Sequence, residues 1–415
     1  MVTEFAPVLS LAQRFSSVRE ETDRLFGILN ASVLYARPIP ERHRIIFYVG
    51  HLEAFDWNLL RGILKLAPFH TEFDRLFAFG IDPVDGGLPN DQPEDWPSTH
   101  EVENYRQQIR QRLDAALSAV TDSEELVQLT NIAIEHRLMH AETLEYMFHQ
   151  LPYSGKVRLD APAAVASGVI AAGIADVPAG MTALGLDRKL GQFGWDNEFE
   201  LHTVEVPAFS IGKHKVTNRE FAAFVEDGGY TRRSLWGESD WEWITKSQIS
   251  HPGFWVPAAD GFRYRGMFEE VLLPLDAPVY VSHAEASAYA RWEGKDLPTE
   301  EEWHRAAHGA KPPAETRKLW DAPVVGSHHA LRSAYGVEGL LGTGWEWTST
   351  KFAPFPGFEI TPAYPGYSAP FFDGKHYVLK GGSVRTAACL LRKSFRNWFQ
   401  AHYQYVYAGF RCVAR

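Results

Sequence analysis

The sequence predicts an α+β protein in which a helical N-terminal half precedes a half built from short strands and turns. Apolar residues in the first 150 positions recur with the period of about 3.6 residues that marks one face of a helix. Beyond Val177 this period is lost, and most of the 13 tryptophans lie after residue 190. We therefore divide the chain into a helical bundle over 1–150, a connector over 151–176 and a second domain over 177–415.

The helical half contains several amphipathic stretches joined by loops. The first covers residues 9–29, a second includes residues 51–60, and a third runs over 101–119. Residues 82–97, which are rich in Pro, Gly and Asp, form a long excursion between helices and are a candidate active-site lid. Helices of this length that pack as a bundle can build a metal site from facing side chains.

Three histidines are the candidate metal ligands of this half. His136 and His140 lie four residues apart in a further helical stretch, so their side chains share one face, one turn apart. His51 lies in a second helix that can face the first. Three histidines without a thiolate or a carboxylate leave coordination positions open, which suits catalysis better than a closed structural site. The alternative is that the His136–His140 pair consists of two unrelated polar residues.

Composition excludes several classes of protein. Apolar residues make up 45% and charged residues 22%, as in ordinary soluble domains. The formal net charge of −11, with no basic run, argues against nucleic acid as a partner. The longest apolar run, near residues 164–174, is too short to span a membrane. With only two cysteines and no signal-peptide pattern at the N-terminus, we expect a reducing compartment, the cytoplasm.

Motifs in the second half resemble those of the formylglycine-generating enzymes, whose fold is a C-type-lectin-like domain with little regular secondary structure. They occur in the order VTNREF (216–221), LPTEEEW (297–303), WEWT (345–348), GGS (381–383) and GFR (409–411). The first half resembles the DinB-like four-helix bundle, whose family metal site uses three histidines. Together the two domains resemble the nonheme iron sulfoxide synthases of ergothioneine biosynthesis, the EgtB type. The resemblance covers nearly the whole chain and implies that His51, His136 and His140 bind iron(II).

The resemblance also implies an activity and substrates. The family uses iron(II) and O2 to join hercynine, the trimethylated betaine of histidine, to a thiol as a sulfoxide. Asn397 matches the position that binds the hercynine carboxylate, and Trp398 the position near its ammonium group. A trimethylammonium group cannot donate a hydrogen bond, so aromatic faces are expected to hold it. The alternative for Trp398 is a core tryptophan in a tryptophan-rich domain.

One departure concerns cysteines. Formylglycine-generating enzymes carry two cysteines after the GGS segment, as copper ligands and redox centre, where this chain has Thr386 and Leu391. Cys389 is out of register, and we expect it to be a small packed side chain. The formylglycine activity is therefore disfavoured.

A second departure concerns the sulfur donor. Relatives that use γ-glutamylcysteine carry arginines in the segment that matches 91–97, and an acid in the position of Phe399. Here 91–97 has three acids and no arginine. Because arginine binds both oxygens of a carboxylate, its absence points to free cysteine as the donor. Met139, in place of a glutamine that often precedes the last iron histidine, completes the predicted substrate-binding residues.

The family also uses an active-site tyrosine as a proton donor, and this steers the reaction to the sulfoxide. The segment 347–358, where the tyrosine is expected, contains no tyrosine and offers Phe352 and Phe355, which lack a hydroxyl. Tyr105 is the candidate substitute, with a packed helix residue as the alternative. Without such a tyrosine, thiol dioxygenation should compete.

The sequence is compatible with several alternative functions. The donor could be a selenosugar, as in selenoneine synthesis, or γ-glutamylcysteine, and an ovothiol-type enzyme would act on histidine itself. A binding protein with a structural metal would have a closed site with a fourth protein ligand. Asp56, five residues past His51, could orient a ligand, but we expect it to face solvent.

Overall fold

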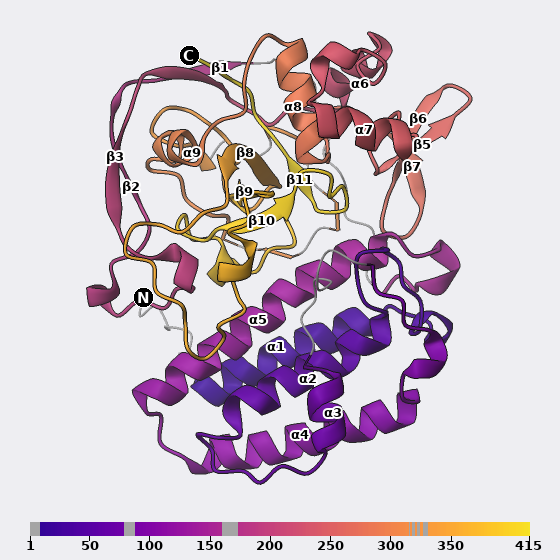
Figure 1. Cartoon of the computed structure of the whole chain (residues 1–415), viewed down its shortest axis with the longest axis vertical. Coiled ribbons are helices and arrows are strands. Elements are labelled where there is room, and N and C mark those ends of the chain that lie inside the picture. Colours follow the sequence, from indigo (N-terminus) through magenta and orange to yellow (C-terminus); the bar gives the residue numbers. More distant parts are fainter. Residues whose placement is uncertain are drawn as a thin grey trace, which may run out of the picture. The chain divides into compact units, whose positions relative to one another are not determined.

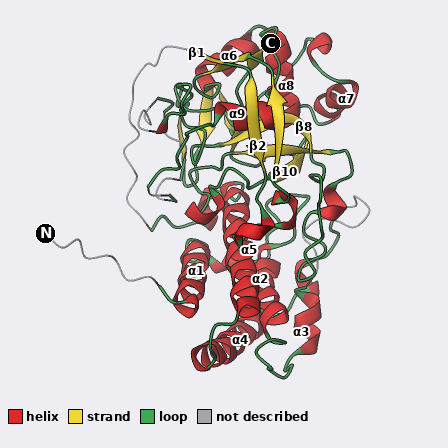
Figure 2. Cartoon of the chain, turned by 90° about the vertical axis from the view of Figure 1, so that its left-hand side faces the viewer, coloured by secondary structure: helices red, strands yellow, loops and turns green. Residues whose placement is uncertain are grey.

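The computed structural model of the 415-residue chain describes residues 9–78, 88–159, 173–314, 316–317, 320–321, 324–326 and 331–415. Contacts divide the chain into two compact units, Met1–Asp160 and Ala161–Arg415. The first is helical, and the second combines short helices and strands with long loops (Figures 1 and 2). The predicted α+β class is confirmed. The predicted connector lies partly outside the described residues, and strand β1 begins within it, at Ile174.

The first unit is a four-helix bundle, as predicted. Its helices are α1 (Leu11–Phe26), α2 (Ile45–Leu60), the short α3 (Thr71–Leu76), α4 (Thr99–Ala119) and α5 (Glu124–His149). Helices α1 and α2 each pack against both α4 and α5 (Figure 1). The candidate lid over 82–97 is described only from residue 88, where a one-turn helix covers Pro93–Asp95.

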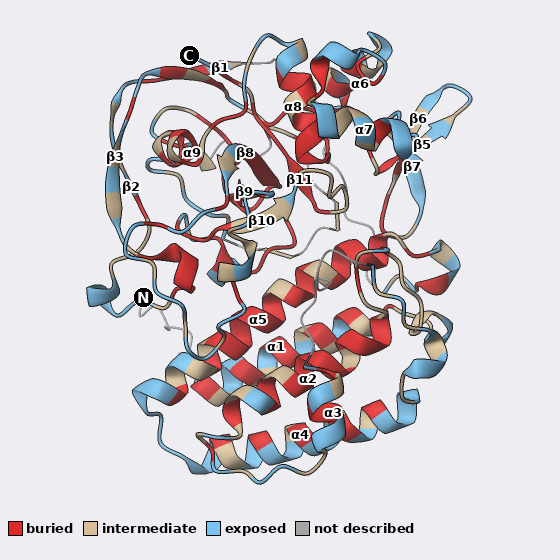
Figure 3. Ribbon diagram, in the orientation of Figure 1, coloured by how far each residue is buried: buried red, intermediate tan, exposed pale blue. Residues whose placement is uncertain are grey.

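Side-chain caps fix where the bundle helices begin. The Ser98 hydroxyl accepts from the Glu101 backbone N–H, while the Glu101 carboxylate accepts from that of Ser98. This reciprocal capping box satisfies two backbone donors at the start of α4. Ser123 caps α5 in a simpler way, by accepting from the Leu126 N–H. Most of α5 beyond Ile132 is buried (Figure 3).

Short strands and helices make up the second unit. The strands are β1 (Ile174–Val177), β2 (Gly180–Leu184), β3 (His202–Val206), β4 (Phe209–Gly212), β5 (Trp255–Ala258), β6 (Gly261–Arg265), β7 (Glu270–Leu272), β8 (Trp345–Lys351), β9 (His376–Lys380), β10 (Asn397–Gln400), β11 (Ala408–Gly409) and β12 (Val413–Ala414). They pair as β1-β4-β12, β10-β9-β8-β11, β2-β3 and β5-β6-β7. Only β11 runs parallel to its neighbour, β8, among these pairs. The helices are α6 (Asn218–Glu226), α7 (Glu238–Lys246), α8 (His283–Trp292) and α9 (Glu300–Ala306).

Two of the sequence motifs are helix starts. In VTNREF, Thr217 and Glu220 form a capping box at α6, and in LPTEEEW, Thr299 and Glu302 form one at α9. Trp303, on α9, is fully buried in the hydrophobic core of this unit. These capping residues therefore fix where two short helices begin. Helices this short are not stable in isolation and depend on caps and packing.

Two other motifs meet through a buried ion pair. Glu346 of WEWT accepts from the Arg411 Nε of GFR at 2.9 Å, and the Lys215 Nζ lies 3.0 Å from Glu346. Gly381 of GGS has φ +98°, and a Cβ there would collide with the Leu340 carbonyl, so this position requires glycine. The motifs thus mark the contacts that hold loops in place.

None of the described helices combines the length and the apolar character that crossing a lipid bilayer requires.

Candidate metal centre

The three predicted histidines meet inside the first unit. His51 comes from α2, and His136 and His140 come from successive turns of α5. One nitrogen from each ring lies within 4.8 Å of the other two. The exposed fractions of the three side chains are 4%, 2% and 3%, so all three are buried.

Neighbouring groups set the orientation of the rings. His51 Nδ1 lies 2.7 Å from the Phe77 carbonyl oxygen, so Nδ1 carries the proton and donates, and Nε2 keeps its lone pair. The phenyl ring of Phe47 stacks on His51 at 4.9 Å between centroids, and that of Phe55 stacks on His136 at 3.4 Å. These contacts hold the imidazoles in place.

Burial keeps the imidazoles neutral. It lowers the pKa of His51 to about 4 and holds the pKa of His136 and of His140 well below the ordinary value. His136 Nε2 and His140 Nε2 are 3.1 Å apart, which two protonated rings would not tolerate. Neutral imidazoles are the form that binds metal ions.

The donor set fits an open metal centre. Three imidazole nitrogens suit zinc, copper, nickel or iron, and no described cysteine, aspartate or glutamate joins the group. A structural site would carry four protein ligands, whereas three leave positions for water or a substrate. This residue set therefore fits the iron(II) that the family resemblance implies.

Asp56 does not face solvent as expected. It is fully buried and pairs with Arg137 of α5, because α5 covers this face of α2. Arg137 also donates to the Leu52 carbonyl at 3.0 Å. The spacing within α2 could not reveal this pair, because Arg137 is supplied by α5, next to His136.

Tyr105 is buried on α4, and its hydroxyl donates to Asp74 Oδ1 at 2.7 Å. Burial, followed by this hydrogen bond, raises the pKa of Tyr105. Its ring lines a cavity of about 610 Å³ that Trp96 also lines. It also lies 6.0 Å from the ring of Phe77, whose carbonyl binds His51. The hydrogen bond to Asp74 supports the alternative of a packed helix residue.

Met139 lies on α5 between the two ligand histidines and is half-buried.

The other predicted substrate-binding residues form strand β10 of the second unit. Trp398 is half-buried and stacks on Phe352 at 4.3 Å between centroids, with Tyr367 and Phe371 at 5.3 and 5.5 Å. Asn397 Oδ1 accepts from the Trp398 backbone N–H, which leaves its side-chain NH2 group to donate elsewhere. The partly exposed Trp398 belongs to an aromatic group, which is the kind of surface that holds quaternary ammonium ions.

Phe399, the next residue of β10, stacks on Tyr403 at 5.0 Å with nearly parallel rings.

The segment 91–97 contains no arginine, but two arginines from elsewhere in the bundle reach it. Arg37 and Arg44 both pair with the Asp91 carboxylate, and Arg44 also donates to the Asp91 carbonyl at 2.8 Å. Sequence position alone did not reveal them. Both guanidinium groups donate to the Asp91 carboxylate and to backbone carbonyls, so their donors are already engaged and do not form a ready clamp for a further carboxylate.

The cysteine expectation was wrong in one respect. Cys389 is exposed, because it lies in a one-turn helix whose next residue, Leu390, points into the core. Thr386 is buried, and its hydroxyl accepts from the Ser383 N–H. Leu391 is buried as well. The two positions that hold cysteines in formylglycine-generating enzymes are therefore packing positions here.

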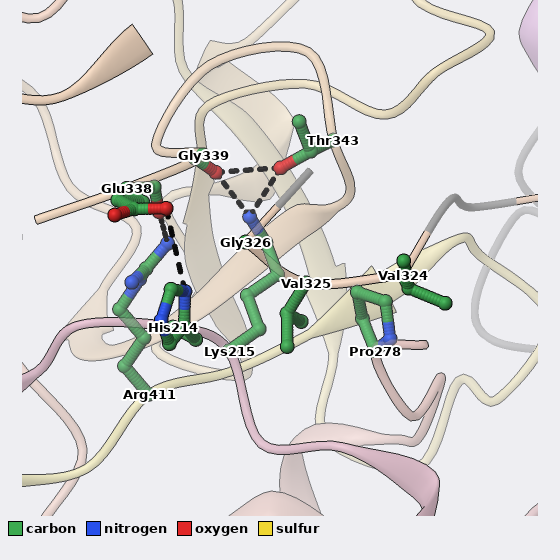
Figure 4. A pocket seen from close by; sticks show the side chains of 10 residues that line it. All are labelled: His214, Lys215, Pro278, Val324, Val325, Gly326, Glu338, Gly339, Thr343 and Arg411. Atoms are coloured by element: carbon green, nitrogen blue, oxygen red, sulfur yellow. Dashed lines mark hydrogen bonds and ion pairs between the residues drawn. The ribbon is translucent and has the colours of Figure 1, made fainter. Parts of the chain in front are cut away.

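A polar cavity of the second unit is too small for a substrate. It encloses about 20 Å³ beside Lys215, Thr343 and Arg411, enough for one water molecule (Figure 4). Lys215 Nζ donates to Thr343 Oγ1 at 2.9 Å, so the cavity belongs to the ion-pair structure of the motifs.

Sequence reasoning missed Phe47, Phe55 and Phe77. The first two lie four residues on either side of His51, so helical spacing could have identified them. Phe77 acts through its backbone carbonyl, which no residue pattern marks.

Comparison with known families agrees with this organisation. The sulfatase-modifying factor enzyme 1-like domain matches residues 169–415, and the DinB superfamily matches residues 14–147. The chain is 42% identical over 256 residues to hercynine oxygenase from Mycolicibacterium thermoresistibile, covering 55% of each chain. It is 30% identical over 436 residues to ergothioneine biosynthesis protein 1 from Schizosaccharomyces pombe, covering 93% of this chain and 53% of the relative.

A third relative is the formylglycine-generating enzyme of Mycobacterium tuberculosis, 28% identical over 297 residues, with 58% of this chain and 97% of the relative covered. The chain spans little more than half the length of the hercynine oxygenase and of the fission yeast protein. The chain therefore belongs to the sulfatase-modifying factor enzyme 1-like family, in the EgtB-type arrangement in which a DinB superfamily domain precedes that domain.

Proposed function

We propose that this chain is an oxygenase of ergothioneine biosynthesis, an iron(II)- and O2-dependent sulfoxide synthase that joins hercynine to free cysteine. His51, His136 and His140 would hold the iron. The observation that carries the proposal is the buried group of three neutral imidazoles, with no fourth described protein ligand, in a chain similar to a hercynine oxygenase. A structural metal in a binding protein would favour a closed site instead.

Bound iron(II) would supply the redox chemistry for O2 and open coordination positions. The protein's part is to hold the ring nitrogens in place and to bind the acceptor. Trp398 and its aromatic neighbours offer π-faces for the trimethylammonium group, which cannot donate a hydrogen bond. The side-chain NH2 group of Asn397 would donate to the hercynine carboxylate.

Cysteine is the proposed donor because, in the described part of the chain, the arginines that reach 91–97 already donate to Asp91 and to backbone carbonyls. Arg37 and Arg44 reach this segment but are paired with Asp91. Phe399 stacks on Tyr403 where γ-glutamylcysteine-using relatives carry an acid. A selenosugar lacks the γ-glutamyl carboxylate too, so the same contacts are compatible with it.

Product analysis tests the proposal directly. Protein loaded with Fe(II) under anaerobic conditions would receive hercynine and O2 with cysteine, γ-glutamylcysteine or a selenosugar, and products would be identified by mass. We expect a cysteine sulfoxide conjugate in the first case. The same incubation with His136→Ala is the control, and it should give no product. Absence of any conjugate with all three donors would refute an enzymatic role.

The same assay tests Tyr105 as the proton donor. If the tyrosine has this role, Tyr105→Phe should shift the product from the sulfoxide towards cysteine sulfinate. If Tyr105 only packs against Asp74, the variant should lower stability by about 1 kcal/mol and leave the product ratio unchanged.

A further inference from the structure

Arg137 connects the two helices that carry the candidate metal ligands. It follows His136 on α5, and its side chain is 1% exposed. Its guanidinium donates to the Leu52 carbonyl of α2 at 3.0 Å and pairs with Asp56. Because Leu52 follows His51, one planar group joins the backbone beside one ligand to the helix that carries the other two.

The connection extends through the whole bundle. Arg137 also donates to the Thr22 hydroxyl of α1 at 3.2 Å and lies 3.4 Å from the Glu53 carboxylate. Glu53 accepts from Arg110 of α4 at 2.6 Å, and Arg110 donates to Asp23 of α1 at 2.8 Å. All four long helices therefore meet in one ion-paired network.

Stability alone is a poor explanation for this network. Removing two charges from water costs several kcal/mol per ion, and replacing a buried pair by apolar residues of similar volume is often neutral or stabilising. A guanidinium, however, presents its donors in a rigid plane, so its partners must lie in fixed directions. Such a group restricts how two helices rotate and slide against each other.

The metal site needs this restriction. The three ring nitrogens lie within 4.8 Å of one another. A shift of α2 by one residue along α5 would translate His51 by about 1.5 Å and rotate it by about 100°. That change would remove its nitrogen from the group.

We propose that Arg137 is a positioning residue: by binding the Leu52 carbonyl and Asp56 it sets the register of α2 against α5, and with it the geometry of the three-histidine site. This inference rests on the proposed metal centre and concerns the affinity and geometry of that centre. The hydrogen bonds of Arg137 go to α1 and α2 and to no histidine ring, so its effect on the metal is indirect.

Cobalt(II) binding to the full chain tests the proposal, because the visible spectrum of the bound ion reports coordination geometry. The main variant is the double substitution Arg137→Met with Asp56→Leu, which removes both charges and leaves Glu53 paired with Arg110. We expect its metal-free unfolding in urea to stay close to wild type, while cobalt affinity falls at least about 10-fold and the spectrum changes. Arg137→Lys keeps the charge without the planar fork and should give a smaller loss of affinity.

A matched control is Arg19→Met. Arg19 is buried, and its guanidinium donates to Asp114, so this ion pair joins α1 to α4 and includes neither helix that carries a histidine. It should leave cobalt affinity and spectrum unchanged. A folded double variant with wild-type cobalt affinity and spectrum would overturn the proposal. If the double variant does not fold, wild-type cobalt affinity and spectrum in Arg137→Lys would overturn it instead. Failure of the wild-type chain to bind cobalt would instead remove the metal centre itself, and the proposed function with it.

Discussion

Both units bury arginine–carboxylate pairs, but the pairs organise different kinds of structure. In the bundle, Arg137 and Asp56 join long regular helices next to three histidines. In the second unit, Arg396–Glu300 and Arg411–Glu346 join short elements that are far apart in sequence. In the bundle, the helical repeat of α5 brings His136 and His140 together, and the contacts of Arg137 set how α2 lies against α5. The second unit has little regular structure, and its buried pairs hold the loops themselves.

Loss of a ligand histidine should give the largest effect. His136→Ala removes one of three donors, so we expect metal binding to be abolished while the bundle stays folded. Metal content measured by mass spectrometry after dialysis checks this. His100→Ala, at an exposed position of α4, is the control and should keep the wild-type metal content. Unchanged metal content in His136→Ala would contradict the ligand assignment.

Removal of a buried acid from the second unit should lower the stability of the protein and leave metal binding unchanged. Glu300 is 1% exposed and accepts three hydrogen bonds from Arg396, two from Nε at 2.9 and 3.2 Å and one from a terminal nitrogen at 3.0 Å. Glu300→Gln leaves buried cations without a counter-charge, which costs about 3–5 kcal/mol in urea unfolding. Glu293→Gln breaks only an exposed pair with Lys295 and should cost less than about 1 kcal/mol. A loss of metal binding in Glu300→Gln would contradict the conclusion that the buried pairs of the second unit support its loops and not the metal site.

A buried histidine in the second unit should make that unit sensitive to acid. His283 stacks on Tyr377 at 3.5 Å, and burial lowers its pKa to about 3. Between pH 6.5 and 3 the unfolded chain binds a proton that the folded chain does not, so stability falls as the pH falls. The contribution is about 2 kcal/mol between pH 6.5 and 5. His283→Phe keeps the stacking and should flatten this slope in urea titrations.

The exposed His308→Phe should leave the slope unchanged. An equal slope in wild type and His283→Phe would assign the acid sensitivity to other groups.

A single added methyl group should give the smallest effect. A Cβ at Gly50 of α2 would lie 2.5 Å from the ring of Phe77, whose carbonyl binds His51. Gly50→Ala should therefore displace Phe77 and weaken cobalt binding a few-fold, despite a helix propensity gain of about 1 kcal/mol. Gly62→Ala, where the added group has no neighbour within 4 Å, should leave binding unchanged.

The sequence was most informative where one regular element determines geometry. A spacing of four residues was enough to predict that His136 and His140 share a helix face, and the amphipathic period predicted the bundle. The second domain was identified by its motifs and not by periodicity. The structure shows what those motifs do: some cap short helices, and others form buried pairs such as Glu346–Arg411.

Contacts between distant segments could not be read in this way. Arg37 and Arg44 reach Asp91 from about 50 positions away, and the Phe77 carbonyl reaches His51 from the turn that ends α3. Asp56 was expected at the surface because its burial depends on a charge supplied by α5. Such contacts follow from packing, which local sequence does not specify.

The hydrogen bond between His51 and the Phe77 carbonyl links metal binding to the stability of the folded chain. It selects the ring tautomer during folding, so an ion that binds at the proposed site would meet a prearranged lone pair. The unfolded chain has no equivalent arrangement, and a ligand that binds only the folded state raises stability by about 2.7 kcal/mol at 100 times its dissociation constant. If the proposed metal binds here, its supply should therefore also set how well the folded chain withstands heat and proteolysis.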